Sequence, residues 1–331
     1  MSTLLRVLVF VFASAVALHT RAGTPAPTHD QHASVPFDVV ISPPAPSRQK
    51  IIDFWTRERM EEAWPASFSP PYGGDPIEPF LDPKADHSGY TLMPSPYASH
   101  LFSRLTGILY FRRANTNGEG YVVQHCSASI IHSISQNLIL TAAHCVHEPI
   151  HHVWNDMFMF VPGFDGKQAP LEKWPIQSAY IPGQDAQESP ETDIAVARVY
   201  PLPSGKTLEA EVGPGTAFFP HVSTNENEAF SMVKDVGYPS VSRFGEDPVY
   251  ENAEQRQCNS GTAPGKENPK TLLLLNCTPQ AGNSGGPIVR LFNPPFEVVG
   301  VFVKTNPLAG QARLLPQTFV PIYKAADSTP K

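Results

Sequence analysis

From about residue 99 onward the chain is a succession of short apolar and β-branched runs separated by turn residues, and this texture constrains the fold more than any other feature. Long amphipathic helical patterns are absent from the same region. Many short strands with turn signals between them are typical of an all-β sandwich or barrel. Two strand-rich halves flank the Pro- and Gly-containing stretch 200–215. The clearest runs are 108–111, 121–123, 129–131, 138–140, 159–161, 194–197, 272–275, 288–289 and 298–303.

The preceding part of the chain, residues 23–98, is rich in proline and small polar residues. Such a composition cannot bury enough apolar surface to offset chain entropy, so we expect most of it to be extended or disordered. One island, from Lys50 to Trp64, has apolar residues at mixed helical spacing and is ended by Pro65. It predicts a short helix near 50–64, with a flexible linker carrying an apolar patch as the alternative.

Residues 1–22 have the pattern of an export signal. Arg6 supplies a positive charge, an apolar run follows over 7–18, and cleavage after Ala22 fits the small residues there, with Ala15 and Ala17 as alternatives. A buried N-terminal strand or helix is the competing interpretation. The run is shorter than the roughly 20 apolar residues that span a bilayer, and no later stretch qualifies. We therefore predict a secreted, extracellular protein with no membrane partner.

Charge and cysteine content narrow the function further. The net charge is −7 with no basic stripe, which argues against a nucleic-acid partner. An even number of cysteines in an exported chain, 4 here, implies two disulfides. Three pairings are possible. The spacing favours Cys126 with Cys145 and Cys258 with Cys277, because each pair brackets one local segment.

Three separate segments carry residues suited to nucleophilic catalysis. An apolar strand delivers His144, Asp193 opens a second apolar strand, and Ser284 lies in the glycine-rich turn 282–286. A serine hydroxyl needs a neighbouring base, and a buried carboxylate fixes the tautomer of an imidazole that acts as that base. Backbone amides of Gly282 and Ser284 would face a developing oxyanion, and one such donor typically contributes about 2.7–4 kcal/mol. Each segment alone has a structural explanation, but together they predict a catalytic triad.

These segments resemble the trypsin-like serine peptidase family, in particular its secreted microbial branch that includes the glutamyl endopeptidases. The likeness covers about residues 107–323 and is most specific around His144 and Ser284. It implies two six-stranded antiparallel β-barrels, at about 99–210 and 211–331, with the active site in the cleft between them. Supporting blocks are Cys126-Ser127-Ala128-Ser129, Phe160-Val161-Pro162-Gly163 and Gly237-Tyr238-Pro239.

The resemblance also implies the Cys126–Cys145 bridge and a maturation step. Residues 54–60 look like part of the pro-segments of some such enzymes, so 23–98 is a predicted pro-segment and 99–331 the peptidase domain. Animal digestive members carry an acid before the nucleophile that pairs with a freed N-terminus, but Asn283 stands there in this chain. Removal of the pro-segment is then expected to uncover the cleft instead.

The substrate pocket implied by the same alignment departs from known specificities. Its wall falls at Thr278, Pro279, Val303 and Thr305, which offer no carboxylate for Lys or Arg. Pro279 and Phe302 also replace the threonine and histidine of strict glutamyl enzymes. A small or restricted pocket is therefore expected.

Three alternatives bear on the function. A nucleophile elbow of the α/β-hydrolase type also fits Gly282-x-Ser284-x-Gly286, but Pro287 opposes the helix it needs and no histidine follows. A metal site among the histidines near 144–152 fails because Pro149 separates His147 from His151 and Cys145 is expected in a disulfide. The third is a catalytically inactive homologue that acts as a secreted binding protein.

The prediction is thus a secreted serine endopeptidase that needs no metal or cofactor and acts on a protein or peptide substrate. The one N-glycosylation match, Asn276-Cys277-Thr278, lies beside a predicted disulfide, so we expect a buried, unmodified asparagine.

Overall fold

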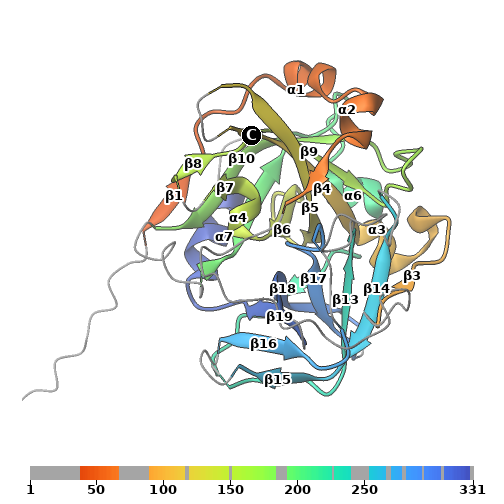
Figure 1. Ribbon diagram of the computed structural model, residues 1–331, viewed down its shortest axis with the longest axis vertical. Helices are drawn as coiled ribbons and strands as arrows, with labels where there is room; N and C mark the ends of the chain where they lie inside the picture. Colours follow the sequence, from red (N-terminus) through yellow and green to blue (C-terminus); the bar gives the residue numbers. More distant parts are fainter. Residues whose placement is uncertain are drawn as a thin grey trace, which may run out of the picture. The chain divides into compact units, whose positions relative to one another are not determined.

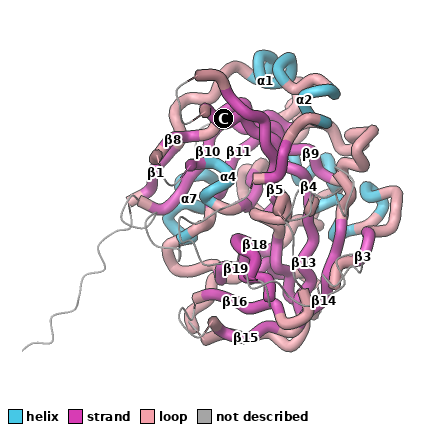
Figure 2. The backbone as a smooth tube through the Cα atoms, in the orientation of Figure 1, coloured by secondary structure: helices cyan, strands magenta, loops and turns pink. Residues whose placement is uncertain are grey.

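The computed structural model describes residues 38–66, 89–115, 119–148, 151–183, 192–225, 227–239, 253–265, 270–277, 281–292, 294–306 and 309–328. The predicted export signal lies outside these ranges. Strands predominate over helices in what is described, and the prediction of an all-β protein is confirmed (Figures 1 and 2). No described helix has the length and apolarity required to cross a bilayer.

Six antiparallel strands close the first barrel. Their order is β10-β11-β6-β5-β4-β9, and the pairing of β9 with β10 completes the ring. The longest ladder joins β4 to β5, with Thr106 opposite Ser129 at one end and Ala114 opposite Tyr121 at the other. The strands are β4 (Thr106–Ala114), β5 (Tyr121–Ile131), β6 (Leu138–Thr141), β9 (Asp156–Pro162), β10 (Trp174–Pro182) and β11 (Ala195–Val199).

The second sheet curls into a half-barrel. Its order is β15-β16-β19-β18-β17-β13-β14-β3, and no pairing between described residues joins its two ends. The short strand β12 (Phe219–Pro220) pairs in parallel with β18. The other strands are β3 (Thr91–Leu92), β13 (Val233–Gly237), β14 (Arg256–Ser260), β15 (Thr262–Pro264), β16 (Thr271–Leu274), β17 (Pro287–Arg290), β18 (Glu297–Asn306) and β19 (Ala309–Leu314).

One apolar core connects the two sheets. Every residue of β6 and of β11 is buried, which explains why 138–140 and 194–197 appear in the sequence as continuous apolar runs rather than alternating ones. The cluster that they form extends to Val289, Val298 and Val301 of the second sheet. Burial of this shared surface is the main favourable contribution to folding, and it couples the barrel that carries His144 to the sheet that carries Ser284.

Helices are few and short. The longest described helix, α7 (Phe319–Ser328), packs on the first barrel, where Arg198 Nη1 donates to Ala326 O at 3.0 Å and Tyr323 donates to His132 O at 2.8 Å. The remaining small elements are η1 (Tyr97–Ser99), α3 (Leu101–Leu105), α4 (Ala143–Val146), β7 (His147–Glu148), β8 (Val153–Trp154) and α6 (Leu208–Val212).

Residues 38–66 form regular elements against the first barrel. Strand β1 (Val39–Ile41) pairs antiparallel with β10, and β2 (Trp64–Pro65) pairs in parallel with β5. Between them lie two helices, α1 (Arg48–Phe54) and α2 (Arg57–Glu61), in the stretch for which the sequence predicts one helix.

The two helices are separate because each has its own cap. The hydroxyl of Ser47 accepts the amide of Lys50, and the hydroxyl of Thr56 accepts the amide of Arg59. The first helix ends at Phe54 with Trp55 as its C-cap, and Thr56, whose backbone is extended as expected of an N-cap residue, begins the second.

The apolar residues of this island pack against the barrel rather than against solvent. Ile51, Trp55 and Met60 are buried in a cluster with Tyr110 and Met159. The rings of Trp55 and Tyr110 lie 5.3 Å apart, and the Trp55 indole donates to a backbone carbonyl, that of Met157. Tertiary burial thus stabilises helices that are too short to persist alone.

Both expected disulfides are present. Cys126 in β5 is joined to Cys145 in α4 with 6.2 Å between their Cα atoms, and Cys258 in β14 is joined to Cys277 with 6.0 Å. The first bridge fixes α4 against the barrel wall.

The burial of Ile51 leads to a prediction about stability. In a full-length chain carrying Ser284→Ala, which prevents self-cleavage, Ile51→Ala should lower the free energy of unfolding by about 2–5 kcal/mol because it leaves a cavity. Ile134→Ala is the control, since Ile134 is 94% exposed, and should change it by less than about 0.5 kcal/mol. Urea unfolding measures both. Equal, small losses of unfolding free energy in the two variants would show that residues 38–66 do not unfold cooperatively with the first barrel.

Candidate active site

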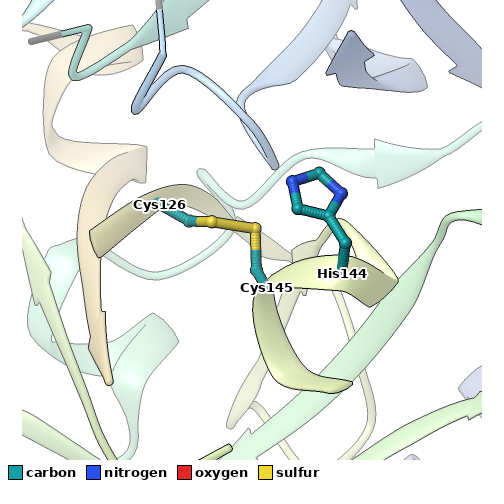
Figure 3. Close-up of side chains that lie close together, drawn as sticks. All are labelled: Cys126, His144 and Cys145. Atoms are coloured by element: carbon teal, nitrogen blue, oxygen red, sulfur yellow. A yellow bond between two sulfur atoms is a disulfide. The ribbon is translucent and has the colours of Figure 1, made fainter. Parts of the chain in front are cut away.

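His144 is held at the junction of β6 and α4. Buried Thr141 ends the strand, and the ring follows in the first turn of a four-residue helix. Figure 3 shows the neighbouring Cys145 bridged to Cys126, with the imidazole projecting beside the disulfide. His144 is only 4% exposed. Strand, disulfide and burial together leave the ring little freedom.

Asp193 binds His144 through both carboxylate oxygens. Oδ2 lies 2.7 Å from Nδ1 of the ring, and Oδ1 accepts the backbone N–H of His144 at 2.9 Å. The contact arises because β11, which starts two residues after Asp193, pairs with β6 so that Ala195 faces Thr141. A carboxylate only accepts hydrogen bonds, so Nδ1 carries the proton and Nε2 of the neutral ring carries the lone pair.

The charge of Asp193 is maintained by this pairing. Burial on its own raises the pKa of a carboxyl group, but the charge of His144 and the two hydrogen bonds from that residue outweigh it, and Arg313 adds to them. The pKa of Asp193 is consequently below its usual value. The group is therefore an anion over the whole range in which an imidazole could work as a base.

The turn that carries Ser284 depends on two glycines with left-handed backbones, Gly282 at φ +93° and Gly285 at φ +84°. A Cβ on Gly285 would lie 2.1 Å from Ser127 O and 2.2 Å from Thr141 Oγ1. No side chain fits there. The turn is therefore packed directly on β5 and β6, the strands that also hold the His144 helix.

Hydrogen bonds from Ser127 fasten the same turn. Its amide donates to Ser284 O at 2.7 Å, and its hydroxyl donates to Gly282 O at 2.9 Å while accepting the amide of Tyr238 at 2.8 Å. Ser127 follows Cys126 directly in β5. Sequence reasoning gave it no role, although it lies in one of the blocks that carry the resemblance.

The reactive atoms of the turn have no protein partners in the described part of the chain. There, no hydrogen bond is made by the Ser284 hydroxyl or by the amide hydrogens of Gly282 and Ser284. Catalytic hydrogen bonds are often loose in the absence of substrate and tighten only in the complex. Among the described residues these amides therefore remain available as donors to an oxyanion. Ser284 itself is 5% exposed.

The predicted pocket residues are only partly described. Thr278 and Pro279 lie outside the described residues, as does the side chain of Thr305. Val303 is 4% exposed and belongs to the apolar core. Next to it, Phe302 exchanges backbone hydrogen bonds with the nucleophile turn, accepting from Gly285 and donating to Gly286 O at 2.8 Å each.

Two other expectations can be compared with the structure. Asn276 is exposed, so the expectation that it is buried is wrong; it lies in a turn after β16, and only its neighbour Cys277 enters the core. The one described group of possible metal ligands is Cys126, His144 and Cys145. Its two sulfur atoms are joined in the disulfide and offer no thiolate to a metal.

A second histidine, His125, lies under the nucleophile turn. It is 1% exposed, its Nδ1 is 3.0 Å from Ala63 O, and its Nε2 would be 2.9 Å from a Cβ on Gly282. Burial lowers the pKa of His125 to about 4, against the opposing effect of hydrogen bonds with the carbonyls of Ala63 and Tyr238. The ring is therefore neutral near pH 7, and it packs between Ala63 of the N-terminal segment and Gly282 of the Ser284 turn.

The described structure thus combines a closed β-barrel and a curled second sheet that share a core, and a histidine–aspartate pair lies on the strands against which a glycine-flanked serine turn packs. The family model described as Trypsin matches residues 111–328. The chain belongs to this family of trypsin-like serine peptidases, and the predicted fold is confirmed.

Solved structures of serine proteases share the fold. A thermostable serine protease, AL20, from an extremophilic microorganism gives a TM-score of 0.58 at 20% identity, covering 70% of this chain and 100% of its own. Protease Anisep from Arthrobacter nicotinovorans gives 0.57 at 20% identity, covering 70% and 98%. A Glu endopeptidase in complex with MPD gives 0.51 at 16%, covering 73% and 98%. No curated protein is significantly similar to the chain.

The packing of Gly285 predicts a large and specific effect. Gly285→Ala should lower kcat/KM at least about 100-fold, because the new methyl group collides with backbone and displaces the oxyanion donors. Gly205→Ala is the matched control: its φ is +81°, but no atom lies within 4 Å of the new Cβ. It should cost about 1–2 kcal/mol of stability and leave kcat/KM unchanged. Peptide hydrolysis and urea unfolding of both variants test this, and equal activities would refute it.

The neutral state of His125 predicts a pH effect on stability. The unfolded chain takes up a proton near pH 6.5 and the folded chain only near pH 4, so the stabilisation is complete above pH 6.5 and is lost as pH falls. His125→Asn keeps a donor toward Ala63. In the Ser284→Ala background, the stability advantage of the histidine chain over the His125→Asn variant should shrink by about 2 kcal/mol between pH 7 and pH 5. An advantage that stays constant over this range would contradict the burial argument.

Proposed function

We propose that the protein is a secreted serine endopeptidase in which Ser284 is the nucleophile, His144 the general base and acid, and Asp193 the residue that orients the imidazole. The observation that carries the proposal is the double contact of Asp193 with the ring and the backbone of His144, at 2.7 and 2.9 Å. It is supported by the packing of the Ser284 turn on the strands that hold this pair.

The reaction follows from these groups. The Ser284 oxygen attacks the carbonyl carbon of a peptide bond while its proton passes to Nε2 of His144. The imidazolium, stabilised by Asp193, then gives that proton to the leaving nitrogen, the C–N bond breaks, and an ester on Ser284 remains. Water then attacks the ester carbonyl while His144 takes a proton from it. The acyl C–O bond to Ser284 breaks, His144 returns the proton to the Ser284 oxygen, and the carboxylic product leaves.

Negative charge on the attacked oxygen needs fixed donors. The amides of Gly282 and Ser284 are the candidates, because neither is used by a described residue and both belong to a turn clamped by Ser127. Donors held in place before the reaction require no reorganisation as the charge develops.

The full-length chain is proposed to be a precursor. Pro65 lies against the Gly282 turn, with its Cβ 3.3 Å from where a Cβ of Gly282 would be, and Ala66 donates to His125 O at 2.8 Å. His144 and Ser284 are both almost fully buried in this form. Removal of β2 would open the side of the turn that it covers, which is how the predicted loss of the pro-segment would permit substrate binding.

Export and specificity remain proposals of the same kind. Two disulfides and no free cysteine among the described residues favour an oxidising compartment, in keeping with the predicted export signal. A small or restricted substrate pocket is proposed from the predicted wall residues Thr278, Pro279, Val303 and Thr305.

Covalent labelling distinguishes the peptidase from an inactive homologue. The secreted, matured wild-type chain should react with a fluorophosphonate probe at Ser284 and hydrolyse a denatured protein, whereas Ser284→Ala should do neither. Sequencing the products would give the specificity. A matured wild-type chain that is folded but neither labels nor cleaves would favour the secreted binding protein.

The role of Asp193 has its own test. Asp193→Asn preserves the shape of the side chain but presents an amide to His144, which favours the wrong tautomer. The variant should lower kcat by about four orders of magnitude with little change in KM. Thermal unfolding controls for folding, and a loss of less than tenfold in a folded variant would remove Asp193 from the triad.

A further inference from the structure

Residues 89–93 are built into the second sheet although they precede the predicted peptidase domain. Strand β3 pairs with β14, and Met93 donates to Gln255 O at 2.8 Å. Gly89, at φ +76°, lies so close to the turn after β16 that a Cβ would be 2.0 Å from Asn276 O. These contacts bury Tyr90, which is 5% exposed.

The hydroxyl of Tyr90 enters a buried polar network behind the nucleophile. It donates to Oδ2 of Asp235, and the same oxygen accepts Nδ2 of Asn283 at 2.8 Å. Asn283 Nδ2 also lies 3.2 Å from the Tyr90 oxygen. Asp235 and Asn283 are both fully buried. Each of the three side chains thus contacts the other two.

The network is connected to the reactive turn through Asn283, which immediately precedes Ser284. Its side chain passes over Gly237 in a slot so narrow that a Cβ there would lie 1.8 Å from Oδ1. Its backbone carbonyl accepts the amide of Gly286 at 2.8 Å. With the side chain anchored and the carbonyl bound, the peptide between Asn283 and Ser284, whose N–H is a proposed oxyanion donor, has one orientation.

Asp235 depends on uncharged donors, which are the Tyr90 hydroxyl, the Asn283 amide group and the backbone N–H of Val236. No described Lys, Arg or His forms an ion pair with it, and an unpaired carboxylate is costly to bury. Burial raises the pKa of Asp235 to about 7, although the hydrogen bonds from Tyr90 and Asn283 act in the opposite direction. Loss of either donor would leave a buried acceptor less satisfied and its partner free to turn.

We propose that Tyr90 is a positioning residue of the mature enzyme: together with Asp235 it anchors Asn283 and so orients the amide of Ser284 toward the oxyanion. This inference rests on the proposed function. This chain has Asn283 instead of an acid before the proposed nucleophile. In our proposal the Tyr90 hydroxyl, just before strand β3, supports the turn through Asn283. The maturation cut therefore lies before Gly89, not near residue 98, because a cut after Tyr90 would remove the anchor.

The first test compares two tyrosines of the same segment. Tyr90→Phe should lower kcat about tenfold or more with KM changed less than about twofold, and slow fluorophosphonate labelling to the same extent, because one buried hydrogen bond to the anchor is lost. Tyr97→Phe is the control. Tyr97 is also buried and its hydroxyl accepts the backbone N–H of Gln255 at 3.2 Å, whereas Asn283 forms its described side-chain hydrogen bonds with Tyr90 and Asp235. It should lower stability while leaving kcat unchanged.

A second variant and the mature N-terminus complete the test. Asn283→Asp places a second carboxyl group against Asp235, and like charges disfavour each other, so kcat should fall further than in Tyr90→Phe. N-terminal sequencing should find a mature start at or before Gly89. Full kcat in Tyr90→Phe, equal losses in both tyrosine variants, or an active chain starting after Tyr90 would overturn the inference alone. An inactive, unlabelled wild-type chain would instead overturn the proposed function together with it.

Discussion

The contact of the Gly285 turn with the strand pair β5–β6 is the constraint from which the rest of the site follows. Backbone atoms of Ser127 and the hydroxyl of Thr141 occupy the volume where a side chain would begin, so the turn and the barrel meet without any intervening group. The same strands position the His144 helix, one through the disulfide and the other through chain continuity. The two parts of the proposed catalytic triad, which are far apart in the sequence, therefore share one rigid support.

Electrostatics complete what packing begins. Both carboxylate oxygens of Asp193 contact His144, one at the ring and one at the backbone N–H, and this double contact aligns the ring. Asp235, which is fully buried, has neutral donors instead. The pKa values of the two acids shift in opposite directions: that of Asp193 is lowered and that of Asp235 is raised. The difference lies in their partners, a histidine that can carry positive charge in one case and hydroxyl and amide groups in the other.

Short-range sequence patterns were sufficient to predict the strands and the blocks around the candidate triad. Buried strands such as 138–141 appear as apolar runs, and His144, Asp193 and Ser284 stand in short blocks with characteristic neighbours. Ser127, His125 and Tyr90 could not be assigned in this way, because their roles arise from contacts with residues 62 to 155 positions away. The helical island shows a further limit: apolar spacing predicts a helix at 50–64, but a capping hydroxyl at Thr56 divides it. Asn283 was visible as a departure from a familiar pattern, and only the fold connects it with Asp235.

The attachment of residues 38–66 to the barrel makes cleavage and release two different events. In this segment β1 pairs with β10, β2 pairs with β5, and three large apolar side chains are buried in a cluster with barrel residues. Breaking a peptide bond between Ala66 and Gly89 would leave all of these contacts in place and would change only the effective concentration of the segment. After such a cut the enzyme and its former N-terminal piece would form a non-covalent complex, so that activity would appear on dilution or on digestion of the piece rather than at the moment of cleavage.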